Sequence, residues 1–161
     1  MKYDSKSILE IAIAEEKKAS RFYSNLALQM EDAGAKLKFE IMSATEQKHF
    51  EQLLSYYQKK FQTTPEGKDM GEGIIVRPEM LPTTASFEEA VRVIMDTERK
   101  AWEFYKKAFE TATDENDRKI FNSLAQMEQA HYEQFRTEYN FSTETTIRFA
   151  SEDIPWMLEV F

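Results

Sequence analysis

The chain contains no cysteine, little glycine and proline, and no long apolar run. Without cysteine, it cannot form disulfides, zinc sites built on thiolates, cysteine-ligated iron–sulfur centres or a catalytic thiol. No segment approaches the ~20 apolar residues of a membrane span, and Glu10 interrupts the most apolar N-terminal stretch, residues 8–14, which argues against a signal peptide. We therefore expect a soluble, cytoplasmic protein.

Basic residues are also in deficit. The chain has 21 Lys and Arg against 29 Asp and Glu, which gives a net charge of −8 over 161 residues, the length of one ordinary domain. Nucleic acid and anionic membrane surfaces require a basic face, so we expect neither as a partner. Cationic partners, including metal ions, suit this charge.

Glycine and proline are concentrated in one place. Three of the four glycines and three of the four prolines fall between residues 63 and 85, which predicts a long connection there. The stretches on either side are rich in good helix formers. Gly34 divides the first stretch, the second divides near Asp114, and Ser86 with Glu89 forms a capping-box pattern. We therefore predict helices over residues 5–31, 35–61, 86–112 and 114–139.

The two predicted helix pairs are related by an internal repeat. A shift of 82 residues aligns residues 8–57 with 90–139 without a gap, and 13 of the 50 positions are identical. Two helical hairpins joined by one long crossover predict an all-α, ferritin-like four-helix bundle with an internal two-fold repeat. We place this bundle at residues 1–139, with helix pairs over about 5–61 and 86–139 and the crossover at 62–85.

Residues 140–161 form a short C-terminal tail in this prediction. The tail begins with Ser, Thr and β-branched residues and ends in an apolar segment over 154–161. Since that many apolar groups in solvent would form an association surface, we expect the tail to pack on the bundle or on a partner. We expect a homodimer rather than a cage, with the tail at or near the interface.

Each predicted helix has one glutamate in the middle of its apolar seam. The four glutamates are Glu16, Glu46, Glu98 and Glu128. The two histidines of the chain, His49 and His131, each follow a seam glutamate by three residues and share its helical face. A glutamate on a helix is usually solvated, and a lone histidine is usually a satisfied core residue. Four carboxylates in a dry core, however, would each cost several kcal/mol unless they were protonated or neutralised by cations.

This donor set predicts two metal ions. A single zinc needs three or four ligands, whereas four carboxylates and two imidazoles suit two ions that share bridging glutamates. Either Glu16 and Glu98 or Glu46 and Glu128 would bridge, and each histidine would bind one ion. Glu15 aligns with a threonine in the second copy, so we expect Glu16 to be the ligand and Glu15 to be solvated.

The pattern resembles the ferritin-like di-iron carboxylate proteins. The Glu-x-x-His motifs at residues 46–49 and 128–131 carry this resemblance, and the repeated Glu-x-x-Ala-x-x-Phe-Tyr pattern is similar to the rubrerythrin branch. The resemblance spans residues 5–139 and implies two iron ions, with manganese as the alternative, and a six-residue ligand set of Glu16, Glu46, His49, Glu98, Glu128 and His131. It also implies a catalytic role for Tyr23 and Tyr105 through hydrogen bonds to ligand carboxylates, although simple core packing would explain both tyrosines equally well.

Two departures from rubrerythrins affect the expected function. Rubrerythrins carry a cysteine-ligated rubredoxin domain that supplies electrons, so this cysteine-free chain requires an external electron-donor protein. They also have an extra glutamate ligand three residues after the third-helix glutamate, where this chain has Ala101. The expected six-ligand site is closer to the ferroxidase centre of bacterioferritin, but no haem-ligating methionine is recognisable.

Three functions are compatible with such a site. The first is a di-iron oxidoreductase that reduces hydrogen peroxide or dioxygen. The second is a ferroxidase that stores iron, and the third is a bundle whose metals only stabilise the fold. We expect the first, with cycling slowed relative to rubrerythrins and shifted toward dioxygen chemistry because Ala101 removes one anionic ligand.

Overall fold

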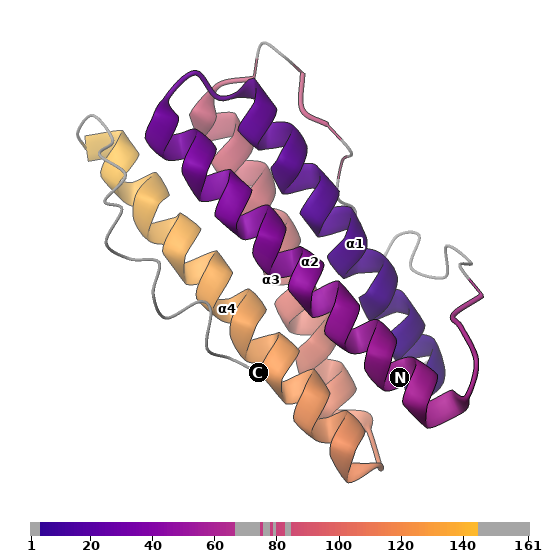
Figure 1. Cartoon of the computed structure of the whole chain (residues 1–161). Helices are drawn as coiled ribbons and strands as arrows, with labels where there is room; N and C mark the ends of the chain where they lie inside the picture. The colour runs from indigo at the N-terminus through magenta and orange to yellow at the C-terminus, as the bar shows by residue number, and fades with distance from the viewer. Residues whose placement is uncertain (1–3, 67–74, 76–77, 79, 83–84, 145–161) are drawn as a thin grey trace.

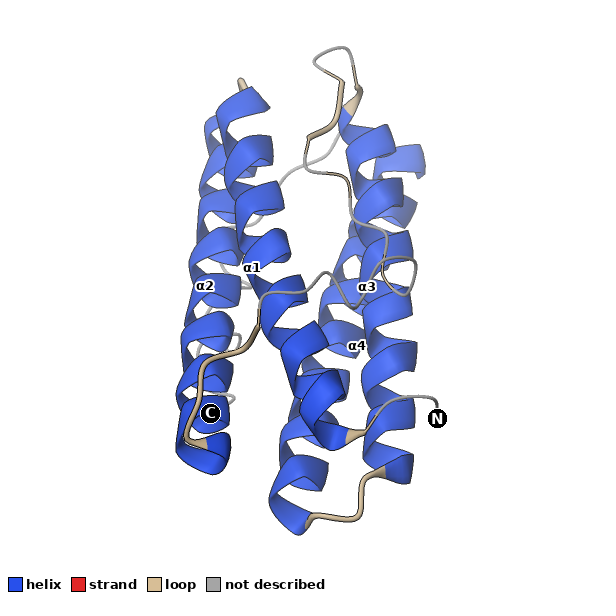
Figure 2. Cartoon of the chain, turned by 90° about the vertical axis from the view of Figure 1, so that its right-hand side faces the viewer, coloured by secondary structure: helices blue, strands red, loops and turns tan. Residues whose placement is uncertain are grey.

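The predicted all-α four-helix bundle is confirmed. The computed structural model describes residues 4–66, 75, 78, 80–82 and 85–144, and these contain helices and no strand. The helices are α1 (Ser5–Gln29), α2 (Ala33–Phe61), α3 (Phe87–Thr111) and α4 (Glu115–Glu144). All four run alongside one another along a common long axis (Figure 1). Figure 2 shows α1 and α2 as one pair and α3 and α4 as the other.

The start of α2 differs from the prediction at Gly34. This glycine lies inside the first turn of the helix rather than before it, because Asp32 is the N-cap and its carboxylate accepts a hydrogen bond of 2.8 Å from the backbone N–H of Ala35. An N-cap of this kind overrides the low helix propensity of one glycine in the first turn. Asp114 aligns with Asp32 in the repeat and accepts a 2.9 Å bond from the backbone N–H of Asp117 at the start of α4. The second helix of each pair therefore begins with the same device.

The start of α3 follows the prediction closely. Ser86 and Glu89 form the expected capping box: the Glu89 N–H donates to Ser86 Oγ at 3.1 Å, and the Ser86 N–H donates to Glu89 Oε2 at 2.7 Å. Hydrogen bonding to the Ser86 backbone and side chain also lowers the pKa of Glu89 below its ordinary value. The helix start that ends the crossover is thus fixed locally by the sequence.

The end of α4 was predicted wrongly. The helix continues to Glu144, five residues beyond the predicted end, because residues 140–144 contain neither glycine nor proline to stop it. The other helix ends differ from the prediction by no more than two residues. The tail from residue 145 onward lies outside the described residues, so its predicted packing and its place in a dimer remain predictions.

Two apolar clusters fill the bundle, one toward each end. One cluster contains residues such as Leu9, Leu53 and Phe121, and the other contains residues such as Leu26 and Phe39. The buried glutamates and histidines belong to neither cluster. The polar centre is therefore enclosed along the bundle axis by apolar side chains that keep water out.

Polar contacts join the two helix pairs near the ends of α2 and α4. Lys38 on α2 forms an ion pair with Glu138 on α4. Tyr56 on α2 donates a 2.7 Å hydrogen bond to Asp117 on α4, and Lys60 donates a 2.6 Å bond to the same carboxylate oxygen. These contacts set α2 antiparallel to α4. Among the described helices, none is both long enough and apolar enough to cross a membrane.

Candidate metal centre

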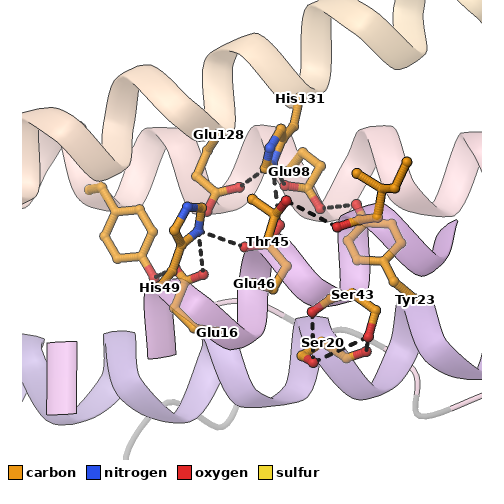
Figure 3. A network of polar contacts seen from close by, with 12 residues as sticks. Glu16, Ser20, Tyr23, Ser43, Thr45, Glu46, His49, Glu98, Glu128 and His131 are labelled. Atoms are coloured by element: carbon orange, nitrogen blue, oxygen red, sulfur yellow. Dashed lines mark hydrogen bonds and ion pairs between the residues drawn. The ribbon is translucent and has the colours of Figure 1, made fainter. Parts of the chain in front are cut away.

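All six residues predicted as ligands are buried at mid-bundle. Each helix contributes one glutamate, and the longer helices α2 and α4 each add one histidine, so that the set is Glu16, Glu46, His49, Glu98, Glu128 and His131. Figure 3 shows these side chains pointing toward one another from the four helices. The heptad spacing is the reason, because it places each residue on the inward stripe of its helix.

His49 lies at the centre of one carboxylate group. Its Nδ1 atom is 3.0 Å from Glu46 Oε2 and 3.5 Å from Glu16 Oε2. The three residues offer ligand atoms that all lie within 4.8 Å of one another. This group comes entirely from the α1–α2 pair and could hold a metal ion.

His131 lies at the centre of a second group that crosses between the helix pairs. Its Nδ1 atom is 3.4 Å from Glu46 Oε1, 3.6 Å from Glu98 Oε2 and 3.7 Å from Glu128 Oε2. The three residues whose ligand atoms converge within 4.8 Å are Glu46, Glu98 and His131, so Glu46 belongs to both groups and Glu128 to neither. Glu46 thus presents one oxygen to each histidine.

The centre contains buried atoms that the protein itself does not satisfy. Within the described part of the chain, Glu46 Oε1, Glu128 Oε2 and His131 Nδ1 make no hydrogen bond although each is shielded from solvent. Buried oxygen and nitrogen atoms that make no hydrogen bond are costly. Carboxylate oxygens and imidazole nitrogens are also the donors that divalent iron or manganese prefers, so the residues present fit a pair of such ions.

Burial and mutual repulsion disturb the proton affinities of the α1–α2 group. Burial, with the neighbouring Glu46 carboxylate, raises the pKa of Glu16 to about 7. Burial would also raise the pKa of Glu46, but attraction to His131 and His49 outweighs it and leaves that pKa below its ordinary value. Burial would lower the pKa of His49, but contacts with Glu16 and Glu46 raise it to about 9. In the metal-free protein, protons therefore balance part of the negative charge.

The α3–α4 residues show the same pattern. Burial and the adjacent Glu98 raise the pKa of Glu128 well above its ordinary value. Burial opposes protonation of His131, but the charge of Glu46 and contacts with Glu128 and Glu98 raise its pKa well above the ordinary value. A cation bound at this centre would replace these protons and release them.

The two predicted tyrosines contact ligand carboxylates in a reciprocal arrangement. Tyr23 on α1 donates a 2.7 Å hydrogen bond to Glu98 on α3, and Tyr105 on α3 donates a 3.2 Å bond to Glu16 on α1. Each phenol thus reaches the glutamate of the other helix pair, as expected where α1 and α3 are antiparallel. Burial and the charges of Glu16 and Glu128 raise the pKa of Tyr105 well above its ordinary value, so this phenol keeps its proton.

The prediction that Glu15 is solvated was wrong. Glu15 is only 3% exposed, and Lys18 pairs with it at 3.3 Å. Its charge also contributes to the raised pKa of Tyr105. The aligned residue Thr97 is buried as well, which shows that this position faces inward in both repeats despite lying beside the seam.

Comparisons with known proteins agree with this geometry. A family model described as Rubrerythrin matches residues 7–139. A solved structure of a hypothetical protein from Pyrococcus furiosus is similar over 91% of this chain and 94% of that chain, with a TM-score of 0.67 and 26% sequence identity. No curated protein matches the chain.

Proposed function

Because the chain belongs to the rubrerythrin family, we propose that it is a di-iron oxidoreductase that reduces hydrogen peroxide or dioxygen with electrons from an external donor protein. The observation that carries this proposal is that four carboxylates and two imidazoles from four helices lie close together and buried at mid-bundle. A single structural ion would need fewer donors. The surplus of buried acceptors matches a two-metal site.

The arrangement of the ligands suggests how they are divided. Glu16 and His49 would hold one ion, Glu98, Glu128 and His131 would hold the other, and Glu46 would be shared, since its two oxygens face different histidines. The sequence left two bridging pairs open, Glu16 with Glu98 or Glu46 with Glu128. The contacts favour Glu46 of the second pair as a bridge, whereas Glu128 would bind one ion only. When bound, a ferrous pair supplies the two electrons that reduction of an O–O bond requires.

The protein groups around the ligands orient them and hold protons. Tyr23 fixes Glu98 and Tyr105 fixes Glu16 by donating phenolic hydrogen bonds. Since the raised pKa of Tyr105 keeps its proton on the phenol oxygen, that proton stays adjacent to the Glu16 carboxylate. Apolar clusters on both sides of the centre exclude water, which strengthens these interactions.

Ala101 favours a second candidate function, that of a ferroxidase. This residue is buried one turn beyond Glu98, at the position where rubrerythrins have an additional carboxylate ligand. With one anionic ligand fewer, the centre would hold ferric ions less tightly, which favours release of oxidised iron, as a ferroxidase requires, over repeated peroxide reduction at resident iron. The relative rates with the two oxidants separate these candidates.

The proposed assembly is a homodimer acting in the cytoplasm. Large apolar side chains are well exposed at Leu28 near the end of α1, Leu37 near the start of α2 and Met80 in the crossover. Such groups support association with another chain. Small-angle scattering tests this proposal: a particle of two chains supports it, whereas a closed shell of many chains would contradict it and favour iron storage.

Stopped-flow mixing tests the proposed reaction. Protein loaded anaerobically with two equivalents of Fe(II) is mixed with hydrogen peroxide and, separately, with dioxygen, and ferric absorption is recorded. We expect at least one oxidant to give this absorption faster than the same Fe(II) oxidises in buffer, and Glu16→Gln to abolish the acceleration. Glu40→Gln removes an exposed carboxylate of α2 and should keep it. If neither oxidant reacts faster than buffer iron, the enzyme proposal fails.

A further inference from the structure

Two serines join α1 and α2 beside the metal centre. Ser20 Oγ donates to the backbone oxygen of Ser43 at 3.0 Å, and Ser43 Oγ donates to the backbone oxygen of Ser20 at 2.8 Å. The two hydroxyl oxygens are 3.3 Å apart. Figure 3 shows this serine pair next to the glutamates and histidines. A backbone oxygen has two lone pairs, so each of these oxygens can accept the serine bond between the helices as well as the hydrogen bond within its own helix.

The serine pair lies very close to two of the candidate ligands. Ser20 follows Glu16 by four residues, and Ser43 precedes Glu46 by three, which places the serines about 6 Å and about 4.5 Å along their helix axes from these glutamates. Reciprocal bonds from short side chains hold two helix backbones at one spacing. The separation between the backbones that carry Glu16 and Glu46 is therefore fixed within one helical turn.

The second helix pair lacks this feature at the equivalent positions. The repeat aligns Ser20 with Trp102 and Ser43 with Ala125. Neither side chain has a hydroxyl group, so this pair cannot form the reciprocal bonds. The Trp102 ring instead packs against Tyr132 with ring centroids 6.2 Å apart. Ring packing tolerates a wider range of distances and angles than a hydrogen bond, so it fixes the helix spacing less closely.

The two candidate ligand groups also differ between the helix pairs. On the α1–α2 side, Glu16, Glu46 and His49 converge within one helix pair. On the α3–α4 side, His131 is closer to Glu46 of the other pair than to Glu98 or Glu128. The helix pair that contains the two serines is thus the one that assembles a three-residue group by itself, whereas the second group needs Glu46 from that pair.

From this coincidence we propose that Ser20 and Ser43 are positioning residues that preorganise the α1–α2 half of the centre, so that the two metal positions are inequivalent and the α1–α2 position binds first and more tightly. The inference rests on the proposed two-metal site. Preorganised ligands bind more tightly because less ordering is required on binding.

A titration of the metal-free protein with Co(II), followed by calorimetry and visible absorption, tests this order. We expect two resolved steps in the unaltered chain. Glu16→Gln should remove the tighter step, and Glu98→Gln the weaker one. If the chain binds no Co(II) at the centre, the proposed function itself fails; if it binds two ions with equal affinity, only the present inference fails.

The serine variants test the cause of the difference. The double variant Ser20→Ala with Ser43→Ala should weaken the first step about tenfold, the size typical of groups that orient metal ligands, and weaken the second step less, because that group shares only Glu46 with the joined helices. Each single variant retains one crossing bond and should show a smaller loss, which keeps the test available if the double variant does not fold. Equal weakening of both steps, or no weakening of the first, would overturn the proposal.

Two control variants separate positioning from general effects. Trp102→Phe alters the equivalent position of the other helix pair and should leave the first step unchanged. Thr137→Ala removes an exposed hydroxyl that bonds to its own helix at Glu133 and should change neither step. A loss of the first step in either control would show that the effect does not depend on the serine pair.

Discussion

The two helix pairs agree at the metal centre and differ around it. The glutamates, histidines, phenols and N-cap aspartates are repeated, whereas several residues that pack around them are not: Ser20 aligns with Trp102, and Glu10 aligns with Arg92. Tyr57 and Tyr139 are equivalent residues, and each donates a hydrogen bond to a carboxylate, Tyr57 to Glu10 and Tyr139 to Glu88 at 3.3 Å. Tyr139 also accepts a bond of 3.0 Å from Arg92, the residue aligned with Glu10.

This comparison separates what the site requires from what packing permits. The repeated residues include the candidate ligands, the phenols that bond them and the aspartates that begin the second helix of each pair. The residues that differ set how closely each helix pair packs, and their divergence makes the two halves of the centre unequal.

The largest effect is expected at Glu46, the carboxylate that belongs to both groups. Glu46→Gln should remove metal from both positions, because its two oxygens face His49 and His131. The equivalent variant Glu128→Gln should keep at least one ion per chain. Elemental analysis after gel filtration measures this difference, and equal metal loss in the two variants would contradict a special role for Glu46.

The next largest effect concerns pH. In the metal-free protein, His49 has a pKa of about 9 against an ordinary 6.5, so its contribution to stability is complete below 6.5 and is lost as pH rises through 9. The pKa of Glu16 is about 7 against an ordinary 4.5. The contribution of its protonated form to stability is therefore complete below 4.5 and is lost as pH rises through 7. Metal binding instead strengthens with pH because protons must leave.

Melting temperatures measured from pH 5 to 9 check both expectations, that the metal-free protein loses stability as pH rises and that metal binding becomes stronger. The metal-free protein should melt several degrees lower at pH 9 than at pH 5.5, while the difference between the loaded and metal-free proteins should widen over the same range. Parallel curves for the two forms would show that the metal does not displace protons from these residues.

A smaller effect is expected from the two phenols. Tyr23→Phe and Tyr105→Phe each remove one hydrogen bond to a ligand carboxylate and should weaken metal binding by about 10–100-fold. The loss should be greater for Tyr23, whose bond is 2.7 Å, than for Tyr105, whose bond is 3.2 Å. Metal competition with a chelator measures both, and unchanged affinity in both variants would favour simple core packing of the tyrosines.

The smallest effect distinguishes the two equivalent tyrosines far from the centre. Tyr57→Phe should lower the free energy of unfolding by about 1 kcal/mol, because Tyr57 is fully buried where it bonds Glu10, whereas the bond from Tyr139 to Glu88 is exposed. Tyr139→Phe, at a half-buried position, should change it by less than about 0.5 kcal/mol. Urea unfolding measures both values, and equal losses would indicate that the helix pairs are less different than the contacts suggest.

Most of the fold could be predicted from the sequence because its signals are local or periodic. The sparse glycine and proline, the capping box at Ser86 and the seam spacing each act within one helix. The start of α2 was placed too late because Asp32 determines it rather than Gly34. The end of α4 was missed because a gradual change of composition, unlike proline or glycine, does not stop a helix.

The sequence predicts which residues form the candidate site, but it predicts less well how these residues lie relative to one another. Heptad spacing indicates that Glu46 and Glu128 both face inward, but which carboxylate approaches both histidines depends on the spacing between helices. The burial of Glu15 and the bonds between Ser20 and Ser43 depend on that same spacing. Helix spacing results from side-chain packing across the interface, which the sequence of one helix does not specify.

Diffraction at the iron absorption edge tests the central claim most directly. Crystals of protein loaded anaerobically with Fe(II) should show two anomalous peaks roughly 3.5–4 Å apart, one beside Glu16 and His49, the other beside Glu98 and His131. Both peaks should lie within coordination distance of Glu46. A single peak, or two peaks outside this set of residues with Glu16 and Glu98 turned away, would contradict the account.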